Sequence, residues 1–138
     1  MCNNNNSDCK CMAEILTVIN ILQQNAECGD SCLDTCDRGF LGCSVTSINC
    51  NTRPITLYIG GSNIPWEMPI SKDPTETTTS SVFRVEKIDG CCATFRVLAT
   101  NPDTTSLYPY ISTNSFFTVN LNCVCALRCL QDTFVDTI

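Results

Sequence analysis

The alternation of apolar and polar side chains is clearest near the end of the chain, from Phe116 to Leu130. The first half of this segment reads FFTVNLNC, in which Phe, Val, Leu and Cys alternate with Thr and Asn. Such period-two alternation predicts a half-buried β-strand. The segment ends in three thiols, those of Cys123, Cys125 and Cys129. We therefore predict a strand that completes a core at its start and offers thiols for cross-linking at its end.

A helical pattern occupies the segment from Met12 to Asn25. Its apolar residues follow the i, i+3, i+4, i+7 spacing of one helix face, namely Met12, Ile15, Leu16, Ile19 and Leu22. Asp8 is a candidate cap for this helix, and Gly29 is a candidate stop. Val18 and Ile21 widen the apolar face, so we expect burial within the domain or at a contact between subunits.

Two further patterns predict strands. Ile55 to Ile59 is a short β-branched and aromatic run, and Val82 to Ile88 and Cys91 to Ala99 flank the dipeptide Asp89-Gly90. Asp-Gly favours a two-residue type I′ turn and hence a hairpin. Such a loop places Ile88 opposite Cys91, and the resulting register leaves neither face of the hairpin cleanly apolar.

Together these elements predict an α+β fold that is mainly antiparallel β, either a small sandwich or a barrel-like sheet. One N-terminal amphipathic helix and cysteine-rich loops complete it. At 138 residues, a single domain is the simplest arrangement. We expect residues 1–11 to form a flexible arm and residues 12–138 to form the domain. Trp66 lies between loop prolines, and we expect it to cover one end of the core or, alternatively, to anchor a protein contact.

Cysteine is the dominant anomaly of composition, with 13 residues. The odd number leaves at least one thiol free, bound to another group, or paired with another molecule. The candidates for disulfides and cross-links are Cys2, Cys9, Cys11, Cys28, Cys32, Cys36, Cys43, Cys50, Cys91, Cys92, Cys123, Cys125 and Cys129. Their pairing does not follow from the sequence. The arm thiols either pin the arm to its own domain or search for a partner on a neighbouring molecule, including the thiols of the closing segment.

The start of the chain, MCNNNNSDCKC, has neither the basic region nor the apolar core of a secretory signal. A cytosolic compartment would keep these thiols reduced. Oxidation after release, for example when a mother cell lyses, reconciles the lack of a secretory signal with the high number of cysteines.

Several function classes are disfavoured by the sequence. The chain has no histidine, no C-x-x-C motif and no glycine-rich phosphate loop, so we expect neither an enzyme nor a cofactor-binding protein. Its net charge is −6 and its eight Lys and Arg are scattered, which argues against a nucleic-acid partner. The longest apolar-rich stretch, Met12 to Leu22, is too short and too polar to span a membrane.

The competing chemical interpretation is a thiolate metal site or a redox buffer. Cys9-x-Cys11 and Cys123-x-Cys125 resemble thiolate clusters, which select zinc or copper(I). Cys28 with Cys32, and Cys125 with Cys129, also have usable spacings. The regular paired knuckles of structural zinc sites are missing, so we expect no resident metal.

Three blocks of the sequence resemble the spore coat CotY/CotZ family, which includes the exosporium protein ExsY of endospore-forming bacilli. They are NTRPITLYI at 51–59, VFRVEKIDGCCATFRVLA at 82–99 and FTVNLNCVCALRCL at 117–130. The chain departs from the family in its CKC and Asn tract and in lacking histidine-rich termini. These differences concern the spore layer rather than the family.

The resemblance implies a structural protein that self-assembles into a two-dimensional hexagonal lattice, locked by disulfides. Its implied partners are further copies of itself, in a hexameric ring, and other coat or exosporium proteins. The resemblance also implies synthesis in the mother cell and deposition on the spore surface, in the outer coat, crust or exosporium. It assigns no catalytic residues.

Overall fold

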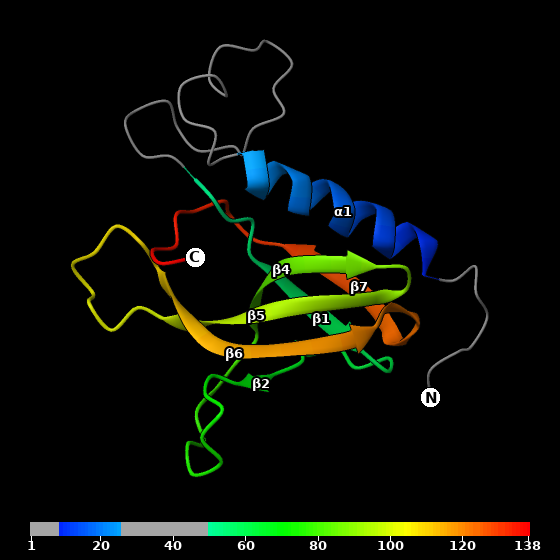
Figure 1. Ribbon diagram of the computed structural model, residues 1–138. Helices are drawn as coiled ribbons and strands as arrows, with labels where there is room; N and C mark the ends of the chain where they lie inside the picture. Colours follow the sequence, from blue (N-terminus) through cyan, green and yellow to red (C-terminus); the bar gives the residue numbers. More distant parts are fainter. Residues whose placement is uncertain (1–8, 26–49) are drawn as a thin grey trace.

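The computed structural model describes residues 9–25 and 50–138 (Figure 1). In chain order its elements are α1 (Lys10–Asn25), β1 (Ile55–Ile59), β2 (Met68–Pro69), β3 (Thr79–Ser80), β4 (Val82–Asp89), β5 (Cys92–Thr100), β6 (Tyr110–Asn120), the short 3-10 helix η2 (Leu121–Cys123) and β7 (Val124–Cys129). The predicted α+β class, mainly antiparallel and with one N-terminal helix, is confirmed. The candidate helix cap and stop, Asp8 and Gly29, lie outside the described residues.

Five strands form one antiparallel sheet in the order β6-β5-β4-β1-β7, and β2 pairs with β3. β6 and β7 lie at opposite edges of this sheet, yet only η2 separates them in sequence. Four strand spacings in a flat sheet measure about 19 Å, whereas the link through η2 advances only about 8 Å. The sheet therefore curls, and Figure 1 shows β1 and β7 crossing behind β4, β5 and β6. Of the two predicted architectures, the chain adopts the barrel-like one.

Helix α1 lies along the sheet beside β4 (Figure 1). It begins at Lys10, slightly earlier than predicted. Its buried side chains are Leu16, Ile19 and Gln23, which share one helix face. Ile15, which the periodicity assigned to that face, is 43% exposed, so the prediction is wrong for this residue. The buried face of the helix instead passes through Leu16, Ile19 and Gln23, and Ile15 lies to one side of it.

The core combines one face of the sheet with the inner face of α1. Its members are Cys9, Leu16, Ile19, Ile55, Leu57, Phe83, Val85, Ala93, Phe95, Val97, Val119, Leu121 and Val124. Trp66 closes one side of it, with its ring 5.3 Å from that of Phe117 and 6.5 Å from that of Phe83. The backbone N–H of Trp66 donates to the Leu57 carbonyl at 2.8 Å, which fixes the loop after β1 against the strand. The prediction that Trp66 covers the core is confirmed.

Gln23 fills the place where two strands separate. β1 and β4 are in register only at Ile55 and Phe83. Beyond that point Nε2 of Gln23 donates to the Val85 carbonyl of β4 at 2.9 Å, and its Oε1 accepts from the Arg53 N–H at 3.0 Å. A buried side chain of the helix thus satisfies a carbonyl of β4 and an N–H in the segment that leads into β1, which would otherwise lack partners.

We expect Gln23→Leu to lower the free energy of unfolding by about 2–3 kcal/mol, because it leaves the two backbone groups buried and unsatisfied. Gln24 is exposed one position further along the helix, so Gln24→Leu is a matched control with an effect within about 0.5 kcal/mol. Urea unfolding midpoints of the two variants measure the difference. Equal midpoints would show that the bridge between β1 and β4 contributes no stability.

The hairpin is confirmed, but its turn differs from the prediction. Asp89 pairs with Cys92, so the two loop residues are Gly90 and Cys91 rather than Asp89 and Gly90. Gly90 has φ +60°, whereas Cys91 is not among the residues with positive φ. Glycine at the first of two loop positions, followed by a residue with negative φ, matches a type II′ turn. The predicted type I′ turn, which needs positive φ at both positions, is therefore wrong.

The changed register also changes the faces of the hairpin. Phe83 lies opposite Val97, and Val85 lies opposite Phe95, and all four are fully buried. The register shifts between Val85 and Lys87, which is a bulge in β4. A shift of one residue in the pairing exchanges the two faces of one strand relative to the other. The predicted register therefore placed apolar and charged residues on the same face, whereas in the structure they lie on opposite faces. The expectation of two incompletely apolar faces is wrong.

The closing segment from Phe116 to Leu130 is two strands rather than one. β6 ends at Asn120, whose side-chain oxygen accepts a hydrogen bond from the Asn122 N–H at 3.0 Å. Leu121 is buried, and its N–H donates to the Cys91 carbonyl at 2.8 Å. This cap and this buried side chain turn the chain at η2, which sends β7 to the opposite edge of the sheet. The apolar-polar alternation continues through η2 in the sequence and therefore hides the break.

Candidate cross-linking site

One end of the curled sheet collects cysteines from three separate parts of the chain. The first turn of α1, the β4–β5 hairpin and the start of β7 lie on the same side of the molecule (Figure 1). η2 is held there by the hydrogen bond from Leu121 to the turn residue Cys91. We call this region the thiol end, and its cysteines are Cys9, Cys11, Cys91, Cys92, Cys123 and Cys125. Cys129 lies at the other end of β7, opposite Ile55, and Cys50 lies in the segment that leads into β1.

Cys9 and Cys91 form a disulfide at the thiol end, with a Cα–Cα distance of 5.7 Å. Cys9 is only 4% exposed, and the bond ties the start of α1 to the hairpin turn. Of the two interpretations of the arm thiols, pinning to the same domain is the one that holds for Cys9. Cys50 and Cys123 are also disulfide-bonded. The remaining cysteines, Cys2, Cys28, Cys32, Cys36 and Cys43, lie outside the described residues.

Four cysteines in the described part of the chain are free and exposed, namely Cys11, Cys92, Cys125 and Cys129. Cys11 and Cys92 flank the Cys9–Cys91 disulfide, one on the first turn of α1 and one at the start of β5. Cys91 is the second residue of the hairpin turn, whereas Cys92 is the first residue of β5. The structure accordingly uses Cys91 inside the domain and leaves Cys92 at the surface.

The other two free thiols lie on β7, an edge strand whose neighbour is β1. Cys125 has no partner on β1, because the register shifts between Tyr58 and Ile59. Cys129 lies opposite Ile55, at the end of the strand. The sequence singled out Cys123, Cys125 and Cys129 together, but the structure separates a bonded Cys123 from two free thiols.

An ion pair lies near Cys129. Arg53 donates from Nε to Oδ1 of Asp132 at 2.7 Å and from Nη2 to Oδ2 at 2.9 Å, and this contact raises the pKa of Arg53. The thiol of Cys129 is accessible, but neighbouring atoms remove part of its hydration, and this desolvation raises its pKa above the ordinary value. Arg53 opposes the rise and Asp132 adds to it.

A raised pKa means that less of Cys129 is thiolate near neutral pH, and the thiolate is the reactive species. We expect iodoacetamide to alkylate Cys129 more slowly in the folded protein than in urea-unfolded protein near neutral pH. The folded rate should rise through a more alkaline range. Mass spectrometry of the peptide that contains Cys129, over a series of pH values, measures both profiles. Identical profiles in the folded and unfolded protein would contradict the expected desolvation.

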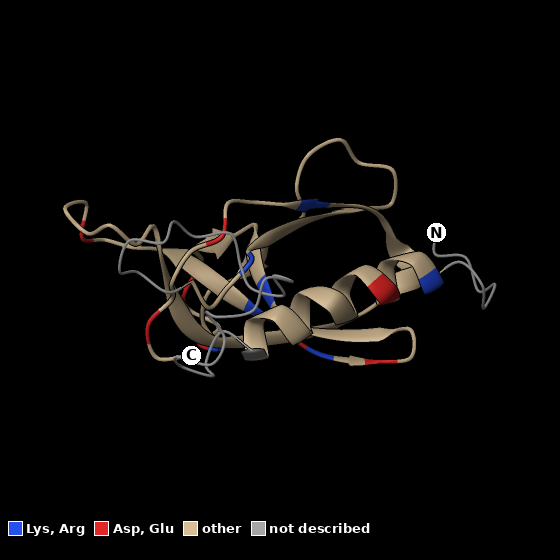
Figure 2. Cartoon of the chain, turned by 90° about the horizontal axis from the view of Figure 1, so that it is seen from above, with Lys and Arg blue, Asp and Glu red and all other residues tan. Residues whose placement is uncertain are grey.

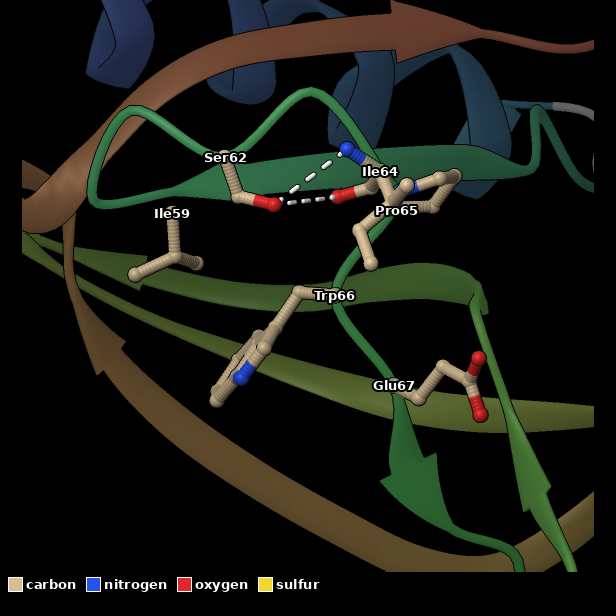
Figure 3. A pocket seen from close by; sticks show the side chains of 6 residues that line it. All are labelled: Ile59, Ser62, Ile64, Pro65, Trp66 and Glu67. Atoms are coloured by element: carbon tan, nitrogen blue, oxygen red, sulfur yellow. Dashed lines mark hydrogen bonds between the residues drawn. The ribbon is translucent and has the colours of Figure 1, made fainter.

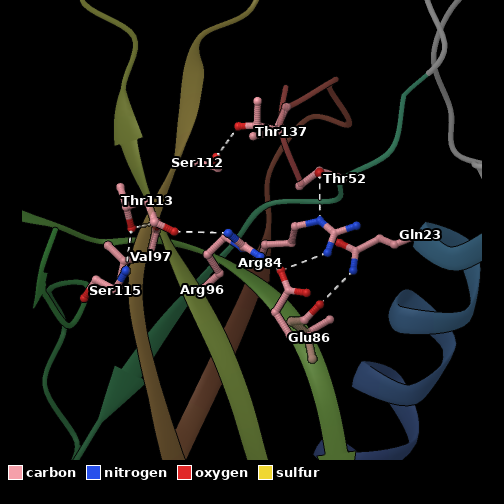
Figure 4. A network of polar contacts seen from close by, with 12 residues as sticks. Gln23, Thr52, Arg84, Glu86, Arg96, Val97, Ser112, Thr113, Ser115 and Thr137 are labelled. Carbon is pink, nitrogen blue, oxygen red and sulfur yellow. Dashed lines mark hydrogen bonds and ion pairs between the residues drawn. The ribbon is translucent and has the colours of Figure 1, made fainter. Parts of the chain in front are cut away.

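An ion network with one buried and two partly buried side chains lies on the outer face of β4 and β5 (Figure 4). Oε2 of Glu86 accepts from Nη1 of Arg84 at 2.9 Å and from Nε of Arg96 at 3.1 Å. Arg84 also donates to the Thr52 hydroxyl at 3.0 Å, and Arg96 donates to the Thr113 carbonyl at 3.1 Å. Because Glu86 is shared between two arginines, the network is suited to fixing strand register and sheet curvature rather than to proton transfer.

A hollow of about 280 Å³ lies beside the loop after β1 (Figure 3). Its lining is mainly apolar, from Ile59, Ile64 and Trp66. The Ser62 hydroxyl is bonded within the loop to the Ile64 N–H at 3.2 Å, and the Glu67 carboxylate accepts from a threonine hydroxyl of β3. The few polar groups that line the hollow are thus hydrogen-bonded within the protein. In a ligand site, such groups point into the pocket and bind the ligand.

The metal alternative finds no support in the described residues. Within residues 9–25 and 50–138, no three Cys, Asp or Glu side chains are placed to hold a metal ion. In each C-x-C pair one member is held in a disulfide, namely Cys9 and Cys123. The remaining spacing, between Cys28 and Cys32, lies outside the described residues.

No described helix is long and apolar enough to cross a membrane.

Comparison with protein families gives a match to the family described as spore coat protein Z, over residues 1–110. The matched part includes α1 and the strands β1 to β5 and ends at the start of β6. The thiols of β7 therefore lie beyond the match. Comparison with curated proteins and with solved structures gives no match.

Proposed function

Since the chain belongs to the spore coat protein Z family, we propose that it performs its structural role on the spore surface by self-assembly. Copies of the chain would form hexameric rings, the rings would form a two-dimensional hexagonal lattice, and disulfides between chains would lock the lattice. The observation that carries the proposal is the division of the cysteines. The Cys9–Cys91 disulfide ties α1 to the core, while four thiols in the described part of the chain remain free at the surface.

The free thiols among residues 9–25 and 50–138 lie on three elements, α1, β5 and β7. Thiols on separate elements allow one copy to bond several neighbours, which a sheet requires and a simple dimer does not. Many identical weak contacts become nearly irreversible once covalent bonds keep the remaining contacts close together. A protein layer of this kind needs no catalytic group.

Helix α1 supports non-covalent contact between copies. Ile15, Val18 and Ile21 are between 43% and 56% exposed, and they lie on neighbouring turns of the helix. Figure 2 shows that charge on α1 is confined to its first turns, where Lys10 and Glu14 lie. Exposed apolar groups that form a patch mark contact sites. Such a patch favours association before any disulfide forms.

We further propose synthesis in the mother cell, followed by oxidation at the spore surface, in the outer coat, crust or exosporium. The free thiols support this order, because reduced thiols persist in a reducing compartment and disulfides form after exposure. Other coat or exosporium proteins with exposed thiols would join the same layer.

Electron microscopy and non-reducing gels of the purified full chain test the proposal. We expect ordered sheets that withstand heat and detergent and that come apart when detergent and a reductant are combined. Protein treated with iodoacetamide before assembly is the matched control, and its assemblies should dissociate in detergent alone. A chain that stays monomeric by negative-stain microscopy and on non-reducing gels would overturn the proposal.

A further inference from the structure

We infer that Leu107 of one copy inserts into the apolar hollow beside Trp66 of a second copy, which joins the chains head to tail. The inference rests on the proposed function and names one contact by which copies meet. It is carried by the exposure of Leu107, by the loop that presents this side chain, and by the size and lining of the hollow.

Leu107 is the most exposed large apolar side chain in the described part of the chain, at 78%. It lies between β5 and β6 in the loop of residues 101–109, the yellow loop in Figure 1. Single exposed apolar residues are common on protein surfaces and carry no inference by themselves. Leu107 differs from such residues because the loop around it is firmly held.

Hydrogen bonds and a ring contact fix the loop beside Leu107. Asn101 donates from its backbone N–H to the Pro109 carbonyl and from Nδ2 to the Tyr108 carbonyl, each at 2.9 Å. The ring of Tyr108, the next residue after Leu107, lies 5.1 Å from the ring of Phe134. A loop that is already fixed loses little conformational entropy when its exposed side chain is buried at a contact.

The hollow matches an aliphatic side chain better than a small-molecule ligand. Its volume of about 280 Å³ lies below the range of about 300–1,000 Å³ that is usual for ligand pockets. Ile59, Ile64 and Trp66 give it apolar walls, and Ile64 is 67% exposed (Figure 3). The side chain of Leu107 brings no polar atom that would need a partner in such a place.

The hollow and Leu107 lie at different ends of the molecule. β1 ends at Ile59, which pairs with Val124 at the start of β7, so the hollow lies toward the thiol end. β5 runs away from the thiol end for nine residues, or about 26 Å, and the loop that carries Leu107 follows it. Leu107 therefore reaches only the hollow of another copy. A contact between two different surfaces continues from copy to copy and closes into a ring where the rotation permits, which the proposed hexamer requires.

The contact is small. One side chain in a hollow of this size covers far less than the area of about 1,200 Å² that a stable interface buries. Two copies joined in this way alone would separate readily. In an assembly the same contact is repeated at every copy, and the other contacts keep its two sides close together.

Charge does not drive this contact. Residues 59–66 contain no charged side chain, and Asp103 is the one charged residue of the loop 101–109. The Asp103 carboxylate accepts a hydrogen bond from the Thr105 N–H at 3.0 Å. Two chains with a net charge of −6 repel each other, and salt screens this repulsion. Association through Leu107 should therefore strengthen as the salt concentration rises.

Trp66 is the only tryptophan of the chain, so its fluorescence reports on the hollow. We expect the emission of the full chain, with its free thiols blocked by iodoacetamide, to shift to shorter wavelength as protein concentration rises, because Leu107 displaces water from Trp66. Leu107→Ala should raise the midpoint concentration of this shift about tenfold or more. Ile111→Ala, which shortens another exposed apolar side chain, should leave the midpoint unchanged. The absence of a shift, or equal midpoints for the two variants, would overturn the inference.

Cysteine trapping tests the head-to-tail direction. Chains with Leu107→Cys, mixed with chains with Ile64→Cys and oxidised by glutathione disulfide, should form a bridge between positions 107 and 64. Tandem mass spectrometry identifies the bridged peptides. The matched control mixes Leu107→Cys with Val18→Cys, at an exposed position of α1, and should give no bridge between positions 107 and 18. A predominance of bridges between two positions 107, or between two positions 64, would show that like surfaces meet and would contradict the inference.

Electron microscopy separates the inference from the proposed function. Leu107→Asp and Ile64→Asp each place a charge in the contact, so both should lose the ordered sheets, and circular dichroism establishes that each variant is folded. Sheets from both variants like those of the natural chain would overturn the inference and leave the proposed function in place. Loss of the sheets with Leu107→Asp alone would show that Leu107 contacts another surface, which also overturns it. If the natural chain forms no assembly, the proposed function fails as well.

Discussion

Replacement of Glu86 by alanine is expected to lower the free energy of unfolding by about 3–5 kcal/mol. Arg84 and Arg96 lie directly opposite each other on β4 and β5, and Glu86 bonds both. Arg84 is only 5% exposed. A guanidinium group cannot lose its charge in a protein, so the variant would retain a buried cation that faces another arginine. Breaking a buried ion pair from one side has this large cost because the remaining charge is uncompensated.

Urea unfolding of Glu86→Ala beside Glu14→Ala measures the effect. Glu14 is exposed on α1, so its replacement should change the free energy of unfolding by no more than about 0.5 kcal/mol. Glu86→Gln keeps an oxygen acceptor, so its free energy of unfolding should lie between those of Glu86→Ala and Glu14→Ala. Adding Arg96→Met to Glu86→Ala should recover part of the loss, because it removes the opposed charge. If Glu86→Ala and Glu14→Ala unfold at the same urea concentration, the network does not stabilise the hairpin.

Loss of the Cys9–Cys91 disulfide is the second large effect that we expect. The two cysteines are 82 residues apart in sequence. On the chain-entropy model, a cross-link that closes a loop of this length stabilises a protein by about 4–5 kcal/mol. Cys91→Ala should therefore unfold at a much lower temperature than the unmodified protein, under conditions without reductant.

Cys92→Ala is a close control for this change, because Cys92 is the next residue, is exposed and is free. Its melting temperature should equal that of the unmodified chain. Reductant should lower the melting temperature of the unmodified protein. The difference in melting temperature between the unmodified protein and Cys91→Ala should then become smaller. If Cys91→Ala and Cys92→Ala have the same melting temperature, the disulfide between α1 and the hairpin does not stabilise the fold.

Local patterns predicted most of the elements of this chain. Ile55 to Ile59 is a strand with the predicted bounds, and the helix differs only at its start. These elements could be read because burial of one face imposes a period on nearby residues. The hairpin was identified by its Asp-Gly dipeptide, but its register was not. Register depends on which side chains meet across the strands, and a bulge in β4 resets it.

The cysteines show the same division. Their number and the odd count are properties of the sequence. The pairing of Cys9 with Cys91 is not, because 13 cysteines allow very many connectivities and only proximity in space selects among them. The break at η2 likewise escaped the pattern, since Leu121 continues the alternation while turning the chain.

The sequence by itself determined the class of fold, its helix and most of its sheet, and a surplus of thiols beyond what a core of this length needs. Only the tertiary structure decided which thiols hold the domain together and which remain at the surface. The physical reason is the curl of the sheet. It brings the two edges near each other, carries β7 across to β1, and gathers at one end cysteines that the sequence keeps far apart.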